Sequence, residues 1–273
     1  MESDRPGKAE GKDNMGNTNI SYLTETWNIT EGCSPVSPAC DHCYAARITQ
    51  RFHPDSNLVT DGEFNGKVII RPDKLDEPLH WRKPRRVGVC FMSDLFHEAV
   101  PDTFLVDVFF NMVPPHSYFL LTKRSKRMWK WIGHYYGKDF SAIFPDVWAG
   151  VTVESPDQLY RLDDLRLTPA AHKWVSIEPM LSEIDLTPYL DFLDWVVFGG
   201  ESGVGARFFD ANWMSKIQKQ CADAGVPCYF KQYGSFHKNP PAIPAEWQQL
   251  PAAKWTEHVE LQPVGWNYTS SGF

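Results

Sequence analysis

The sequence lacks several features that would assign it to a special class of protein. No apolar run approaches the roughly eighteen residues of a membrane helix, so we expect no membrane contact. The first nineteen residues contain no apolar stretch, which argues against a secretory signal and predicts a flexible tail. Six cysteines in 273 residues are too few and too unevenly placed for a disulfide scaffold. These absences favour a cytoplasmic protein in a reducing compartment.

Positive charge is also scarce. The chain has 27 Lys and Arg against 34 Asp and Glu, a net charge of −7, which excludes a protein that coats duplex nucleic acid by bulk charge. Any contact with nucleic acid must therefore come from a local patch. Two runs, 81–86 and 125–131, interleave basic and aromatic residues in the way that follows a nucleic-acid backbone and stacks bases. The alternative for each run is a solvated surface of the fold.

Short β-branched or aromatic runs alternate with helix-like segments from residue 22 to residue 234. The predicted strands are 22–29, 86–92, 118–122, 147–153, 173–177, 195–198 and 227–231, and the predicted helices are 102–112, 125–136, 156–167 and 212–224. This alternation favours parallel strands joined by right-handed crossovers. No glycine-rich phosphate loop follows the first strand, which argues against an open doubly wound sheet. We expect an α/β fold, a partial (β/α) TIM-like barrel of six to seven parallel strands over residues 20–234, with an irregular extension at 235–273.

The most informative segment is a loop that follows the first strand. It carries Cys33, Cys40 and Cys43, is stiffened by two prolines, and leads into a helix predicted to begin near Asp41. A structural zinc site requires four protein ligands, whereas a four-iron cluster held by three cysteines keeps one iron open for a small molecule. His42 is a possible fourth zinc ligand, although it adjoins Cys43. Iron–sulfur, structural zinc and a group of packed thiols all stay open at this point.

A three-cysteine loop after the first strand of a (β/α) chain resembles the radical S-adenosylmethionine (SAM) superfamily. The spacing here is Cys-x6-Cys-x2-Cys, three residues longer in its first half than the usual pattern of that superfamily. A closer resemblance is to a phage and prophage gene-product family of unassigned function, which is distantly similar to spore photoproduct lyase. The matching segments are 26–33, 40–45, 93–97, 121–124, 150–154, 176–179, 199–202 and 230–234.

The resemblance implies a radical-SAM-type barrel with a [4Fe–4S] cluster on Cys33, Cys40 and Cys43, and SAM on its open iron. An external electron donor would reduce the cluster, and cleavage of SAM would give a radical that abstracts hydrogen from a substrate. We expect that substrate to be a nucleic acid or a nucleotide. Two alternatives stay open: a zinc-stabilised nucleic-acid-binding phage protein without catalysis, and a scaffold that keeps its cluster without cleaving SAM.

Polar residues at the predicted strand ends supply the remaining candidates, since ligands of such folds gather there. The expected SAM-binding residues are His42, Tyr44, Ser93, Asp94, Arg124, Thr152, Glu154, Glu178 and Glu201, and the expected catalytic residues are Lys123 and Lys231. Ser93-Asp94 stands where the superfamily carries Gly-Gly-Glu, and Asp94 is expected to accept the SAM ammonium. Lys231 is expected to pair with Glu178 or Glu201 or to contact substrate.

Overall fold

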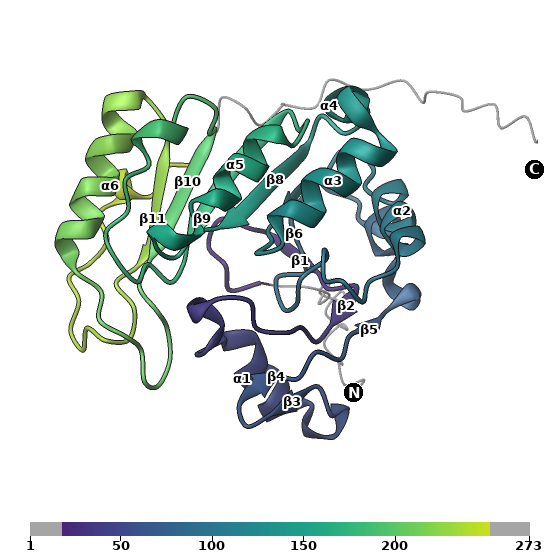
Figure 1. Ribbon diagram of the computed structural model, residues 1–273, viewed down its shortest axis with the longest axis horizontal. Coiled ribbons are helices and arrows are strands. Elements are labelled where there is room, and N and C mark those ends of the chain that lie inside the picture. Colours follow the sequence, from purple (N-terminus) through teal and green to yellow (C-terminus); the bar gives the residue numbers. More distant parts are fainter. Residues whose placement is uncertain (1–17, 252–273) are drawn as a thin grey trace, which may run out of the picture.

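The structure is a computed structural model, and it describes residues 18–251. Seven parallel strands form one curled sheet in the order β1-β6-β7-β8-β9-β10-β11, a half-barrel (Figure 1). The strands are β1 (Glu25–Trp27), β6 (Arg86–Val89), β7 (Ser117–Leu120), β8 (Val147–Thr152), β9 (His172–Ile177), β10 (Trp195–Gly199) and β11 (Cys228–Gln232). The predicted partial barrel of six to seven parallel strands is confirmed, and each predicted strand overlaps an observed one.

Helices cover the convex face of the sheet (Figure 1). They are α2 (Asp102–Phe110), α3 (Ser125–Tyr135), the short α4 (Phe140–Ile143), α5 (Tyr160–Leu167) and α6 (Ala211–Ala224). The bounds of α6 follow from local chemistry, because the Asp210 side chain accepts a hydrogen bond from the Asn212 backbone N–H and Gly225 takes a left-handed conformation at the other end. None of the described helices has the length and apolar character that crossing a bilayer requires.

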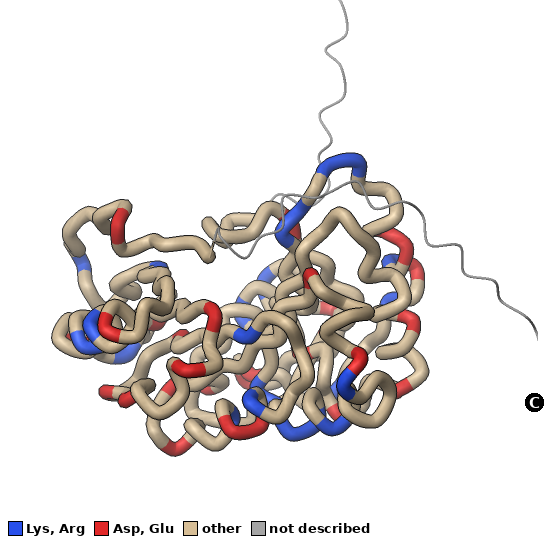
Figure 2. Tube along the Cα trace, turned by 90° about the horizontal axis from the view of Figure 1, so that it is seen from above, with Lys and Arg blue, Asp and Glu red and all other residues tan. Residues whose placement is uncertain are grey.

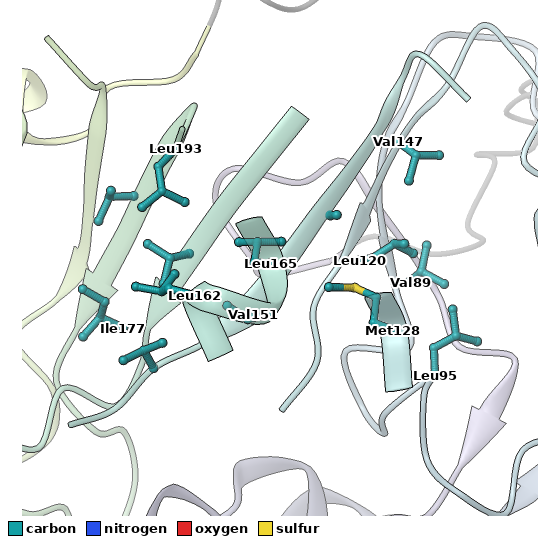
Figure 3. Close-up of a cluster of buried hydrophobic side chains, with 14 of the residues drawn as sticks. Val89, Leu95, Leu120, Met128, Val147, Val151, Leu162, Leu165, Ile177 and Leu193 are labelled. Carbon is teal, nitrogen blue, oxygen red and sulfur yellow. The ribbon is translucent and has the colours of Figure 1, made fainter. Parts of the chain in front are cut away.

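Alternation along each strand divides the interior into two cores. On β8, Val147, Ala149 and Val151 face the helices, where they join an aliphatic cluster with side chains of α3 and α5 (Figure 3). Trp148 faces the concave side, where it meets rings from other strands. Because both faces are covered, β8 is buried at every position, as expected for a central parallel strand.

The segment between β1 and β6 was not predicted to hold strands. It contains α1 (Tyr44–Phe52) and two small antiparallel pairs, β2 (Thr30–Glu31) with β5 (Ile69–Ile70) and β3 (Val59–Thr60) with β4 (Glu63–Phe64). These strands have two residues each, too few for a periodic pattern to show. The helix predicted to begin near Asp41 begins at Tyr44, since the residues just before Asp41 form a 3-10 turn that starts at a proline.

The predicted C-terminal extension is only partly described. Gln248 bridges Tyr229 in an antiparallel manner, and the Gln249 carbonyl accepts a hydrogen bond from the indole of Trp195. Gln248 and Gln249 thus lie beside β11 at the edge of the sheet. The rest of the extension and most of the predicted tail, residues 252–273 and 1–17, lie outside the described residues.

Candidate functional site

A pocket of about 560 Å³ opens at the carboxyl end of the strands, between the concave face of the sheet and the cysteine loop. Its volume is in the range of small-molecule sites, and its position is the one where ligands of barrel folds bind. The residues that line it include thirteen of the fourteen predicted site residues: Cys33, Cys40, His42, Cys43, Tyr44, Ser93, Asp94, Lys123, Arg124, Thr152, Glu178, Glu201 and Lys231. Segments distant in sequence therefore meet at one cavity.

Aromatic rings fill the half-barrel beneath this pocket. Trp148, Trp174 and Trp195 project from neighbouring strands, and the ring of Tyr22 meets the last two edge-on. The indole N–H of Trp174 donates to the Leu120 carbonyl at 3.1 Å, so its polar atom is satisfied inside the core. The rings form the floor of the pocket, whose lining includes Tyr22 and Phe91.

Local backbone chemistry shapes the cysteine loop. Gly32 has φ of +84°, and a Cβ there would lie 2.2 Å from the Lys67 carbonyl oxygen, so only glycine permits this turn. The backbone N–H of Cys43 donates to the Cys40 carbonyl at 3.1 Å, which closes a tight turn between these two cysteines. All three loop cysteines have free thiols, are half-buried and line the pocket.

The three thiols fit a metal or cluster site by their chemistry and their shared pocket. Within residues 18–251, no three side chains of His, Cys, Asp or Glu are gathered closely enough to hold a metal ion as they stand. The cysteine side chains would therefore have to turn toward one another on binding. Burial raises the pKa of the Cys33 thiol to about 11, and the charge of Asp94 acts in the same direction.

Arg124 joins this loop to the ends of β6 and β7. Its guanidinium lies 3.5 Å from the Cys33 sulfur and 3.1 Å from an Asp94 oxygen, and it also donates to the Ser34 carbonyl and hydroxyl at 3.1 and 2.8 Å. Its Nε donates to Glu98 at 2.8 Å. This buried cation is the group best placed to favour a thiolate at Cys33.

Asp94 is fully occupied by contacts within the protein. One oxygen accepts from the Thr122 hydroxyl and the Phe96 N–H, and the other accepts from the Lys123 N–H and the Arg124 guanidinium, at 2.7 to 3.2 Å. A carboxylate has about four acceptor positions, and all four are used here. Asp94 therefore positions Arg124, and its predicted contact with an ammonium group would require one of these bonds to break.

Smaller hydrogen bonds attach two more predicted residues to strand ends. The Ser93 hydroxyl donates to the Thr30 carbonyl at 2.8 Å, and the Tyr44 hydroxyl donates to the Phe91 carbonyl. Tyr44 thus fixes the start of α1 against the end of β6 while its ring lines the pocket.

On the opposite side of the pocket, Glu201 and Arg207 hold the same loop. Arg207 donates to both oxygens of Glu201 and, at 2.8 Å, to the Pro38 carbonyl, while His42 contacts Glu201 at 3.0 Å. Burial favours protonated Glu201, but the hydrogen bonds from Arg207 and His42 outweigh it and lower the pKa of this carboxyl. Sequence reasoning missed Arg207, because no motif marks a cation six residues after the strand-end glutamate.

Lys231 and Glu178 form an ion pair on the pocket wall. The ammonium lies 3.2 and 3.3 Å from the two carboxylate oxygens, and the Ser176 hydroxyl also donates to Glu178. The expected pairing of Lys231 with Glu178 or Glu201 is therefore made with Glu178. Lys123 lines the pocket as well, and its ammonium has no ion-pair partner within the described part of the chain.

Comparison with known families identifies the chain. Residues 17–266 match a family model described as protein of unknown function, DUF5131. The chain belongs to this DUF5131 family. Comparisons with curated proteins and with solved structures gave no match. The match agrees with the predicted resemblance to a family of unassigned function.

One predicted ligand residue of the DUF5131 chain does not line the pocket. Glu154 is completely buried and pairs with the equally buried Arg161 of α5, at 2.9 Å. The guanidinium also donates to the Thr152 carbonyl at 2.8 Å. The expectation that Glu154 binds SAM is therefore wrong: Glu154 ties α5 to the end of β8, whereas Glu178 faces the pocket.

The two basic runs of the DUF5131 chain do not form one basic face. In the run on α3, Trp131 is buried in the core and Arg127 binds the Asp102 carboxylate and backbone carbonyls. In the other run, Arg85 pairs with Glu25 and the Arg86 guanidinium donates to the Tyr22 carbonyl, at the end of the sheet away from the pocket. Figure 2 shows Lys and Arg dispersed among Asp and Glu along the trace.

Proposed function

We propose that this protein is an iron–sulfur enzyme of the radical-SAM type, which binds SAM in the pocket and cleaves it reductively to modify a nucleic acid or nucleotide. One observation carries the proposal: three cysteines of a single loop line one pocket at the carboxyl end of a parallel half-barrel, without a fourth cysteine there. Three thiolates suit a cluster that keeps one iron open. The other three cysteines are buried in the core and do not line the pocket.

The chain's own residues would prepare the site in two ways. Arg124 and Arg207 hold the two ends of the cysteine loop against strand ends, so that the loop exists before any metal arrives. The guanidinium of Arg124 beside the Cys33 sulfur offsets the negative charge that a thiolate ligand brings. The cluster, when bound, would supply the electron that cleaves SAM.

The rest of the pocket offers the contacts that SAM or a substrate requires. Lys123 presents an unpaired cation to a carboxylate or phosphate, and the Glu178–Lys231 pair presents both charges at the opposite wall. Rings of Tyr22 and Phe91 give an apolar surface for a flat base. Asp94 and Glu201 bind the guanidinium groups of Arg124 and Arg207, which in turn hold the cysteine loop at the edge of the pocket. We expect Lys123 and Lys231 to contact substrate or cofactor.

The test is anaerobic reconstitution with iron and sulfide, followed by metal analysis and low-temperature EPR of the dithionite-reduced protein, with and without SAM. We expect a four-iron signal that changes when SAM is added. The Cys43→Ala variant should lose the cluster. The matched control is Cys228→Ala, which removes a thiol from the core instead of the loop and should keep the cluster.

Two results would contradict the proposal. A Cys43→Ala variant that holds as much iron as the wild type would remove the loop from consideration. A colourless protein that retains zinc through aerobic purification would favour the non-catalytic zinc-binding alternative. A cluster signal that ignores SAM would confine the proposal to an iron–sulfur protein without SAM cleavage.

A further inference from the structure

Exposed apolar side chains gather on both sides of the pocket. On α1, Tyr44, Ile48 and Phe52 recur at every fourth residue and form one exposed stripe, of which the first two also line the pocket. Phe208 and Phe236 do not line the pocket, but they follow the pocket-lining residues 200–202 and 231–232 along the chain. They are about half exposed, and their rings meet edge-on at 5.4 Å. We call these five residues the pocket rim. Isolated exposed apolar residues are ordinary, but a gathered set marks an interaction surface.

Hydrogen bonds join the two sides of the rim into one surface. Arg47 of α1 donates to the carbonyls of Ser202 and Val204, in the loop that leads to Phe208. A Cβ on Gly203 would lie 2.3 Å from the Arg47 guanidinium, so the contact depends on glycine there. A ligand that covers the pocket can therefore touch both sides of the rim at once.

Each side of the rim also carries an exposed cation. The Arg51 guanidinium lies over the Phe52 ring, 5.1 Å from its centre, and Lys238 follows Phe236 by two residues. Neither cation forms an ion pair with any of residues 18–251. Aromatic rings beside unpaired cations are the pattern that binds a single strand, since rings stack bases and cations contact phosphates.

We propose that the rim binds single-stranded nucleic acid, with bases on Phe52 and Phe236 and phosphates near Arg51 and Lys238. A strand held at both sides would present the nucleotide between them to the pocket. This inference rests on the proposed function and narrows its substrate class, because a free nucleotide would not need the rim. Of the two basic runs that the sequence offered for this role, Arg127 and Arg85 are engaged in contacts within the protein.

The test measures binding of a fluorescein-labelled DNA strand of about fifteen nucleotides by fluorescence anisotropy, with the full chain free of iron. We expect the wild type to bind the strand more tightly than a duplex of the same sequence or a mononucleotide. Phe52→Ala and Phe236→Ala should each weaken binding about tenfold. The matched control is Phe110→Ala, since Phe110 is the most exposed phenylalanine of α2 and lies on the outer side of the molecule.

A second pair of variants keeps the test decisive if an aromatic variant folds poorly. Arg51→Gln and Lys238→Gln should each reduce the slope of log Kd against log salt by about 0.7, measured between about 50 and 200 mM salt. Equal binding by the wild type and by all four variants would overturn the inference. So would a wild-type dimer, seen by light scattering, that Phe52→Ala converts to a monomer, because a second copy would then cover the rim.

The outcome separates this inference from the proposed function. If the protein binds iron and SAM but no single strand, strand binding by the rim is refuted and the proposed cluster is unaffected. If the single strand binds and the rim variants weaken its binding, but the chain never holds iron, strand binding by the rim is supported and the proposed iron–sulfur cluster is refuted.

Discussion

The two faces of the seven-stranded sheet bury different kinds of side chain. Val, Leu and Ile predominate on the convex face, where Figure 3 shows them between strands and helices, although rings such as Phe109 and Phe140 also pack there; the concave face carries a cluster made mostly of Trp, Tyr and Phe rings. Aliphatic side chains interlock with helices and fill the space between layers. The rings fill the concave side beneath the pocket, and Tyr22 and Phe91 also line the pocket.

This difference decides what a polar residue at a strand end does. Glu154 lies beneath α5 and is sealed with Arg161 in a structural ion pair, while Glu178 follows the next strand and faces the pocket. Two carboxylates that look equivalent in the sequence thus acquire opposite roles. A carboxylate on the convex side is buried with its partner in the core, whereas one on the concave side lines the pocket.

The largest expected effect is on the convex side. Arg161→Leu would leave the buried Glu154 carboxylate without its cation, and its other oxygen already has no hydrogen-bond partner. We expect the free energy of unfolding to fall by about 3–5 kcal/mol, measured by urea denaturation. The double variant Glu154→Leu/Arg161→Leu should recover most of that loss. If Arg161→Leu is as stable as the wild type, the Glu154–Arg161 ion pair contributes no more to the free energy of unfolding than a surface ion pair does.

The next effect is on the concave side. A Cβ on Gly150 would lie 2.2 Å from the Trp174 indole nitrogen and 2.7 Å from the Leu120 carbonyl oxygen. Gly150→Ala should therefore cost about 1–3 kcal/mol through overpacking of the ring cluster. The matched control is Gly133→Ala in α3, where nothing lies within 4 Å. That substitution should stabilise the protein by about 0.5–1 kcal/mol. Equal melting temperatures for the two variants would contradict the tight packing of the rings.

The sequence predicted the barrel better than the site. Strand positions follow from local β-branched and aromatic runs, and the cysteine loop was placed by its position after the first strand, so both were accessible without tertiary information. The pairing of Lys231 with Glu178 was among the expected options because both residues end strands. The ion pair of Glu154 with Arg161 was not, since it depends on which face of β8 the helix α5 covers. Arg207 was missed for the same reason: its partners, Glu201 and Pro38, meet it only through the fold.

The smallest effect concerns the edge of the pocket, where Glu201 and Arg207 hold the cysteine loop. Hydrogen bonds from Arg207, acting against burial, lower the pKa of Glu201 below its ordinary 4.5. A carboxyl whose folded pKa is depressed contributes stability above its unfolded pKa, and that contribution is lost as pH falls through the folded pKa. The Glu201→Gln variant lacks this titration.

The difference in melting temperature between wild type and variant should thus be constant above about pH 5.5 and should shrink as pH falls below about 4.5. Because the site is partly open to water, the difference should stay below that caused by Arg161→Leu. A difference that grows toward low pH would mean that Glu201 is protonated in the folded protein, and the Arg207 contact would then not be what fixes the loop.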